Sequence, residues 1–352
     1  MEPTQDERPA RRRGLAFDLT ALAVVGVLLI GAGVATVGSL YRSLYSPSAF
    51  VADYLDLLAA GRAADALLVP GVAVDSVDLE GAGLPTTASE ALLRRDALAP
   101  LTDVEVVKEV EEDGIHYVTV SYTAGTYEST TTFQVERLGQ IGPAPTWTFA
   151  QSPLAVIELG VSGSMQFSVN GFQIDKRQVS PDGADADPLA PVPMLAFSPG
   201  FYSISVDTPA MQSPGVAVVS DRPQAKVPVG FQAEPTAQFM DVVQRNVETF
   251  LAECATQQVL QPTGCPFGFY VRNRIVAPPE WSITTQPVVT LVPDGAGWAI
   301  ERTQAVAHID VDIRSIFDGS VTRLSEDVPF FLRGSVTILP DDTVSIAVAP
   351  SD

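Results

Sequence analysis

Four ionisable side chains recur at every second position near the C-terminus and are the first candidates for chemistry. They are His308, Asp310, Asp312 and Arg314. Because side chains alternate between the two faces of a strand, a strand here places all four on one face. A histidine beside carboxylates can bind a metal ion or move protons, as in a hydrolase that uses His308 and Asp310. The alternative, which we favour, is the solvated face of a strand whose other face is buried.

Two further groups could do chemistry. His116 lies near a predicted hairpin turn, where we expect an edge or packing role rather than catalysis. Asp182, Asp185 and Asp187 suggest calcium, but they lack the ligand order of an EF-hand and its closing glutamate. We therefore interpret these three aspartates as a solvated acidic loop.

Motifs of known enzyme families are absent from the sequence. The chain has two histidines and contains no H-E-x-x-H, no G-x-S-x-G and no phosphate-binding glycine loop. Trp147, Trp281 and Trp298 are expected to pack in cores or on sheets rather than to form ligand platforms. We predict a non-enzymatic protein with no catalytic, cofactor-binding or metal-binding residues.

Cys254 and Cys265 are the only cysteines. Two cysteines without a nearby histidine do not make a structural zinc site, so we predict a disulfide formed in an oxidising compartment. Closing this short loop contributes about 3 kcal/mol on the chain-entropy model. Two free buried thiols are the alternative.

An apolar segment near the N-terminus predicts a membrane anchor. Residues 19–40 carry no charge, and at about 1.5 Å per residue a helix of this length reaches roughly 33 Å, enough for a hydrocarbon core of about 30 Å. Arg11, Arg12 and Arg13 precede it, which keeps the N-terminus in the cytoplasm. We predict a cytoplasmic basic tail at 1–18, a transmembrane helix at 19–41 and extracellular domains. A cleaved signal peptide is the alternative, although its apolar core is normally shorter.

Small residues recur at every fourth position of this segment. They are Gly31, Ala35 and Ser39. Such a face allows close helix packing and suggests a weak homodimer.

Charge limits the partners of the outer region. The chain has 21 Lys and Arg against 42 Asp and Glu, a net charge of −21. Residues 1–18 are neutral, since four arginines balance four acids, so all of this charge falls on the remainder. A surface this acidic repels phosphate backbones, and nucleic acid is not an expected partner.

Residues 46–152 change from a helical to a strand-like hydrophobic period and are predicted to form an α+β domain. Ser46-Pro47 starts a helix that Gly61 ends. Further helices are expected at 64–69 and 89–97. Strands are expected at 104–111, 115–123, 130–137 and 146–150, with Asp113-Gly114 as the turn between the first two.

Residues 153–230 lack a helical period and are predicted to form a small all-β module. Its strands are expected at 154–161, 165–169, 201–206 and 216–219. Asn170-Gly171 predicts a hairpin turn. The stretch at 180–199, rich in Pro, Asp and Ala, is expected to be a long loop.

Residues 236–350 again begin with a helix, because five side chains share one face at helical spacing. They are Phe239, Val243, Val247, Phe250 and Cys254. Strands are expected at 281–285, 288–292, 297–313, 320–324, 329–338 and 343–348. This predicts a second domain of one helix plus an antiparallel sheet, and an α+β class for the chain as a whole.

Three stretches carry a family resemblance. FVADYLDLLAAGRAADALL and the later TWTFA resemble the NTF2-like superfamily, in which a bent sheet wraps around an N-terminal helix. FSVNGFQID and SPGFYSISVD resemble the β modules of TcaA-like membrane-anchored envelope proteins. LAECATQQ and GCPFGF look like a domain of actinobacterial membrane proteins. TcaA-like proteins usually carry a cytoplasmic four-cysteine zinc ribbon, whereas the tail here has no cysteine, so nothing is inferred from that ribbon.

The anchor, the β-rich outer region and the missing catalytic motifs predict a membrane-anchored extracytoplasmic protein that binds another protein or a cell-envelope component. The first alternative, implied by the NTF2-like resemblance, is a small-molecule or lipid sensor with an apolar pocket. The second alternative is the hydrolase built on His308 and Asp310.

Overall fold

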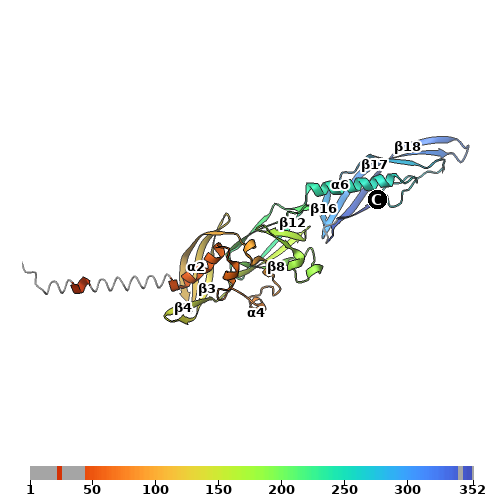
Figure 1. Ribbon diagram of the computed structural model, residues 1–352. Helices are drawn as coiled ribbons and strands as arrows, with labels where there is room; N and C mark the ends of the chain where they lie inside the picture. Colours follow the sequence, from red (N-terminus) through yellow and green to blue (C-terminus); the bar gives the residue numbers. More distant parts are fainter. Residues whose placement is uncertain (1–21, 26–43, 340–343, 351–352) are drawn as a thin grey trace, which may run out of the picture.

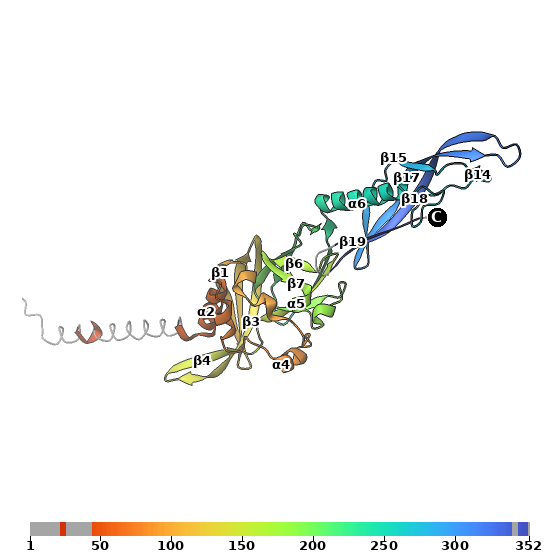
Figure 2. The ribbon, with the colours of Figure 1, turned by 45° about the vertical axis from the view of Figure 1, so that its right-hand side comes forward.

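The computed structural model describes residues 22–25, 44–339 and 344–350. Three β-rich units follow one another along an elongated molecule (Figure 1). Strands β17 (Gly297–Arg314) and β18 (Val321–Ile338) lie in the unit at the end opposite helix α2 (Pro47–Ala59). Between these ends lies a unit whose strands fall within residues 154–232 (Figure 2).

The first unit is an antiparallel meander in the order β1-β2-β3-β4. Its strands are β1 (Leu101–Glu112), β2 (Ile115–Ala124), β3 (Tyr127–Ile141) and β4 (Ala144–Phe149). Asp113 and Gly114 both have positive φ, 52° and 83°, so the predicted hairpin turn is present. Strands over this part of the chain were predicted correctly because alternating side chains and a turn dipeptide are local signals.

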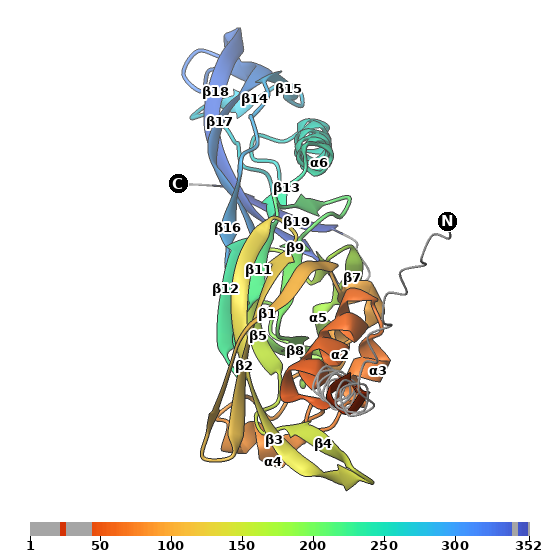
Figure 3. The ribbon, with the colours of Figure 1, turned by 90° about the vertical axis from the view of Figure 1, so that its left-hand side faces the viewer.

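Helix α2 (Pro47–Ala59) packs against this sheet (Figure 3). Ser46 caps it by accepting a hydrogen bond from the backbone N–H of Ala49 at 3.1 Å. Val51, Tyr54 and Leu55 on its inner face are fully buried. The buried face of α2 and the facing side chains of the first sheet therefore share one hydrophobic core.

The short helices differ from expectation. Helix α3 (Ala63–Leu67) lies where one was predicted, whereas 89–97 forms two single 3-10 turns, Glu90–Leu92 and Arg95–Ala97. Helix α4 (Ser76–Gly81) was missed, although Asp75 and Asp78 form a reciprocal capping box at its start. Asp75 and Asp78 are three positions apart, a spacing typical of a capping box, so the start of α4 could have been predicted from the sequence.

The middle unit contains two main sheets, ordered β12-β5-β8 and β11-β9-β6-β7. The strands of the first are β5 (Leu154–Ser162), β8 (Val192–Phe197) and β12 (Lys226–Gln232), with β12 parallel to β5. Those of the second are β6 (Gln166–Val169), β7 (Phe172–Asp175), β9 (Gly200–Ser205) and β11 (Val216–Ser220). A small pair, β10 (Met211–Gln212) and β13 (Glu234–Pro235), lies beside them.

Strands β5 and β8 are buried on both faces. Leu154 and Leu195 belong to the core that α2 and the first sheet share, whereas Ile157 and Met194 belong to the core of the middle and C-terminal units. Burial on both faces explains the continuous apolar run of β5, which lacks polar alternation. Strands β5 and β8 therefore contribute side chains to both hydrophobic cores.

The expected loop at 180–199 is partly wrong. It contains the 3-10 turn Gly183–Asp185, but its end is β8, which pairs with β5 from Leu154↔Phe197 to Leu159↔Val192. Strands β7 and β12 and the short helix α5 (Lys176–Val179) were also not predicted. Four-residue strands and strands that contain Pro or Gly give weak periodic signals.

The C-terminal unit combines helix α6 (Ala237–Ala255) with one long sheet (Figure 2). Thr236 caps α6 by accepting from the N–H of Phe239 at 3.1 Å. Phe239, Val243, Val247 and Cys254 are buried as expected, whereas Leu251 takes the buried place expected of Phe250. The sheet consists of β14 (Arg274–Ile275), β15 (Glu280–Thr285), β16 (Leu291–Asp294), β17 (Gly297–Arg314), β18 (Val321–Ile338) and β19 (Val344–Pro350).

Strand β18 is longer than expected. The sequence predicted two strands separated near Pro329, yet β18 is continuous through Pro329, which lies opposite Val306 of β17. Within the described residues, strand β19 pairs with Leu332–Ile338, so β18 is an edge strand at Pro329 there. Proline is tolerated in an edge strand because its missing N–H removes no bond to a second neighbour.

The predicted α+β class is wrong. Strands make up nearly half of the described residues and helices about a fifth; the strands form several sheets, and most of the helices are short. The class was misjudged because a predicted helix became 3-10 turns and several strands were unrecognised. The described part of the molecule is mostly β.

The predicted basic tail, most of the predicted membrane helix and the Gly31, Ala35 and Ser39 face lie outside the described residues. Of 19–41, only Leu22 to Val25 are described, and they are helical. Within 22–25, 44–339 and 344–350, no helix is both long and apolar enough to cross a membrane.

Candidate functional site

His308 lies at the centre of a polar cluster on one face of strands β17 and β18. The register places it opposite Asp327 and places Asp310 opposite Ser325. His308 Nδ1 lies 2.7 Å from Asp327 Oδ1, and its Nε2 lies 2.9 Å from Ser325 Oγ. The structure therefore gives His308 two partners on β18 that the sequence analysis did not identify.

Asp310 makes the second interaction of this cluster. The Arg323 side chain donates to Asp310 Oδ1 at 3.3 Å, while His308 Nε2 is 3.8 Å from the other oxygen. Hydrogen bonds from Arg323 and then Ser325 lower the pKa of the Asp310 carboxyl below its usual value. Asp310 is consequently ionised at neutral pH. Arg314 lies at the far end of the strand, opposite Val321.

Ser325, His308 and Asp327 have the connectivity of a serine hydrolase triad, because serine contacts Nε2 and the aspartate contacts Nδ1. Their setting differs from a hydrolase. The aspartate of a triad is buried so that it fixes the imidazole, whereas the Asp327 side chain is 67% exposed. An oxyanion hole needs donors aimed above the nucleophile, and strand N–H groups lie in the sheet plane. Cross-strand pairing on a solvated face explains the cluster fully.

His116 lies on strand β2 of the first sheet. Its ring meets Trp147 edge-on, with 5.0 Å between ring centroids. Nδ1 lies 3.5 Å from a Glu109 carboxylate oxygen and has no hydrogen-bond partner within the described residues. This geometry agrees with the predicted packing role.

The acidic residues at 182–187 take part in short-range hydrogen bonds. Asp187 accepts from the N–H of Leu189 at 2.9 Å, and the N–H of Asp185 donates to the Asp182 carbonyl at 3.1 Å. Among the residues that the structure describes, no group of three or more His, Cys, Asp or Glu side chains could hold a metal ion.

The predicted disulfide between Cys254 and Cys265 is confirmed, with Cα atoms 5.8 Å apart. It joins the end of α6 to the loop that carries Phe267. Phe267 packs on Trp281, with ring centroids 4.9 Å apart, and the Trp281 indole N–H donates to the Val259 carbonyl at 2.8 Å. The bridge thus fixes this loop over the long sheet, and it is consistent with an oxidising compartment.

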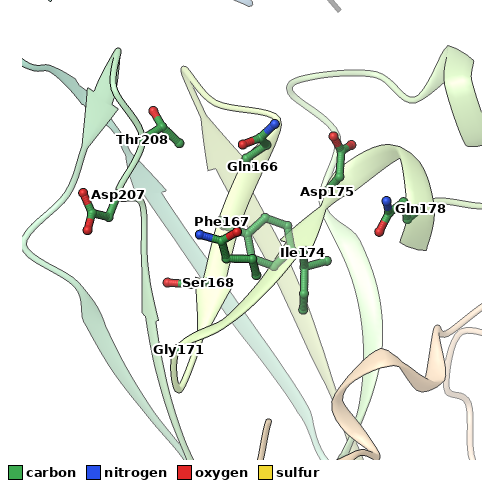
Figure 4. A pocket seen from close by; sticks show the side chains of 10 residues that line it. Gln166, Phe167, Ser168, Gly171, Ile174, Asp175, Gln178, Asp207 and Thr208 are labelled. Atoms are coloured by element: carbon green, nitrogen blue, oxygen red, sulfur yellow. The ribbon is translucent and has the colours of Figure 1, made fainter. Parts of the chain in front are cut away.

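The middle unit has a hollow of about 440 Å³, the polar hollow, between the β6–β7 hairpin and the segment after β9 (Figure 4). Its polar side chains are Gln166, Ser168, Gln173, Asp175, Gln178, Asp207 and Thr208. Phe167 and Ile174 lie among them and are 4% and 3% exposed. Amides, hydroxyls and carboxylates over an apolar base suit a ligand rich in hydroxyl or amide groups.

A second hollow of about 380 Å³, the apolar cavity, lies where the middle unit meets the C-terminal sheet. Met165 and Met211 line it from the middle unit, and Trp298 and Ile338 line it from β17 and β18. Ligand sites often form at such junctions between structural units. Sequence analysis found neither hollow, because each combines segments distant in the chain.

No family model matches this chain, and no curated protein or solved structure matches it either.

The NTF2-like and TcaA-like resemblances therefore stay predictions. The pocket that the first resemblance implies would lie between α2 and the first sheet. There, Tyr54 packs against Phe149 with ring centroids 5.1 Å apart and against Phe133 at 6.2 Å. All three side chains are at most 4% exposed. Aromatic rings fill this part of the core, and the hollows lie elsewhere.

Proposed function

We propose that this chain is a non-enzymatic, membrane-anchored extracytoplasmic protein that binds a cell-envelope component in the polar hollow. The lining of that hollow is the observation that carries the proposal. Gln173 and Asp207 approach it from separate segments and are both exposed, so their polar groups are available to a ligand.

The location is supported by three features. The disulfide is favoured outside the cytoplasm. The uncharged stretch at 19–40 and the arginines before it favour an anchor with the N-terminus inside. The net charge of −21 suits a soluble outer region.

The proposed binding of a cell-envelope component is tested by measuring affinity. The full chain in lipid nanodiscs is mixed with soluble cell-wall glycan and peptide fragments, and affinity is measured by calorimetry. We expect Gln173→Leu and Asp207→Leu each to weaken binding about tenfold, the loss of one good hydrogen bond. Gln238→Leu, an exposed amide on α6, is the matched control. Equal affinities for all four proteins would refute the assigned site.

The proposal that the protein is not an enzyme is tested separately at the His308 cluster. A fluorophosphonate probe reacts with serines that a histidine activates, and Ser325 is the residue placed to react. We expect no labelling, because the cluster lies on a solvated strand face, where the backbone N–H groups lie in the sheet plane and do not point toward an acyl oxygen above Ser325. Labelling that Ser325→Ala or His308→Ala abolishes would overturn the non-enzymatic assignment.

A second candidate function is the sensing of a small molecule or lipid. The apolar cavity favours it, since methionine and tryptophan side chains line a space of ligand size at a junction that binding could stiffen.

A further inference from the structure

The polar hollow and the apolar cavity are neighbours. Gln166 and Thr208 line both of them, so the two spaces meet at these side chains. Beyond Gln166 and Thr208 the polar lining gives way to the apolar lining of the second cavity. Met165, Met211 and Trp298 form part of it. A molecule that extends past Gln166 and Thr208 therefore passes from hydrogen-bonding groups to hydrocarbon and sulfur.

The charges at this boundary are unfavourable for an anionic ligand. Asp175 and Asp207 line the polar hollow, and Arg177 lines the apolar cavity. The Arg177 guanidinium binds Asp175 through two nitrogens, at 2.5 and 2.9 Å. The arginine charge is thereby neutralised within the protein, and the Asp207 carboxylate remains. Phosphate or carboxylate head groups would be repelled, whereas hydroxyl groups can donate to these carboxylates.

Trp298 lines the apolar cavity, while its indole nitrogen is itself buried. It is 3% exposed, and its Nε1–H has no acceptor within the described residues. A Cβ on Gly163, which also lines the cavity, would lie 3.1 Å from Trp298 Cζ2. Cζ2 and Nε1 are bonded to the same ring carbon, so the indole edge that carries the free N–H is the one near Gly163.

We propose that the two spaces form one site for an amphiphile with an uncharged, hydroxyl-rich head and a single hydrocarbon chain, the chemistry of a glycolipid. The head binds in the polar hollow and the chain lies against Met165, Met211 and Trp298. This inference rests on the proposed function and names the class of envelope component. A cell-wall peptide, which would use the polar hollow alone, is the competing ligand.

Tryptophan quenching by a brominated chain tests the site directly. The full chain in nanodiscs is titrated with an alkyl glucoside brominated on its chain, and bromine quenches only indoles that it approaches closely. We expect saturable quenching that Trp298→Phe removes, since Trp147 and Trp281 lie in other parts of the structure. Saturable quenching that persists in Trp298→Phe would overturn the assigned chain site.

Two alanine-to-phenylalanine variants, one in the lining of the apolar cavity and one outside it, give a second readout. Ala210 lines the apolar cavity and is half-buried, so Ala210→Phe should fill the cavity and weaken glucoside binding at least tenfold. Ala190→Phe, a half-buried alanine that does not line it, is the control and should bind as wild type. Equal binding by both variants would contradict the inference.

The head group is tested by exchanging it on the same brominated chain. We expect the glucoside to bind at least tenfold more tightly than the phosphate, and Gln173→Leu to weaken the glucoside only. A phosphate that bound as well would overturn the uncharged head. If wall fragments bind the polar hollow and no alkyl probe quenches Trp298, the amphiphile is refuted while the proposed function stands. If neither binds, the proposed function fails as well.

Discussion

At the scale of single residues, two buried tyrosines differ only in their hydroxyl partners. Tyr54 and Tyr202 are both fully buried. The Tyr54 hydroxyl has no hydrogen-bond partner within the described residues, whereas the Tyr202 hydroxyl accepts from the N–H of Phe197 at 2.8 Å. Burial raises the pKa of both phenols, so both remain neutral donors at physiological pH.

We expect the same substitution to have opposite effects at these positions. Tyr54→Phe removes a buried unsatisfied group and should raise the free energy of unfolding by about 1 kcal/mol. Tyr202→Phe leaves the Phe197 N–H without an acceptor and should lower it by about 1–3 kcal/mol. Urea unfolding followed by circular dichroism measures both changes. A loss of stability in Tyr54→Phe as large as in Tyr202→Phe would show that the Tyr54 hydroxyl has a partner after all.

Arg177 and Asp175 give a pH-dependent prediction. The Arg177 side chain lowers the pKa of Asp175, and partial burial opposes this more weakly. A carboxyl whose pKa is lower in the folded state stabilises the fold above its unfolded pKa of about 3.9, and this contribution is lost as pH falls through the lowered value. Arg177→Gln should therefore reduce stability by about 1 kcal/mol at pH 7, and the difference from wild type should shrink below about pH 4.

Arg222→Gln is the control for that measurement. The Arg222 side chain is 83% exposed and lies 3.6 Å from Asp221, so its loss should change stability by less than about 0.5 kcal/mol. Chemical unfolding at several pH values compares both variants with wild type. An Arg177→Gln deficit that stayed constant between pH 7 and pH 2 would rule out the ion pair as its cause.

At the scale of elements, the disulfide ties a helix to a loop that has no regular structure of its own. Cys254 and Cys265 are separated by 11 positions, and joining them restricts the unfolded chain. The double variant Cys254→Ala, Cys265→Ala should lose about 3 kcal/mol of unfolding free energy. Alkylation before and after reduction should differ by two labels in the wild type. Two labels without reductant would disprove the bridge in the mature protein.

The elements predicted correctly are those specified by neighbours in the sequence. Strands β1 to β4 and helix α6 follow from side-chain period and from the Asp113-Gly114 turn. Strand β8 was taken for a loop because only its pairing with β5 makes it a strand. The Ser325 and Asp327 partners of His308 were missed for the same reason, since their contact depends on the register of β17 and β18.

At the scale of the whole molecule, the predicted boundary between residues 152 and 153 cuts through one hydrophobic core. Leu154 and Val156 of β5 and Phe197 of β8 pack with the side chains under the first sheet, and Ser89 bonds to the backbone of β8 through Pro193 and Leu195. A fragment that ended at 152 would leave the apolar surface that these strands cover exposed to water. Burial of such side chains contributes about 1.5–3 kcal/mol each, which is a large part of the stability of a small domain.

Fragments test this continuity. We expect residues 46–152 to lack a cooperative thermal transition, because the core of that fragment is incomplete. Residues 46–235 keep β5, β8 and β12 together and should unfold cooperatively. Leu195→Ala, which removes a side chain 3% exposed in the shared core, should lower the melting temperature of the longer fragment through a loss of about 2–5 kcal/mol. Met194 lies on the other face of β8, in a core that loses its C-terminal part in this fragment. Met194→Ala should therefore lower the stability of the fragment less than Leu195→Ala does. A cooperative transition in 46–152 alone would show that the first sheet and α2 are an independent domain, and that the shared core is a contact between two folded units.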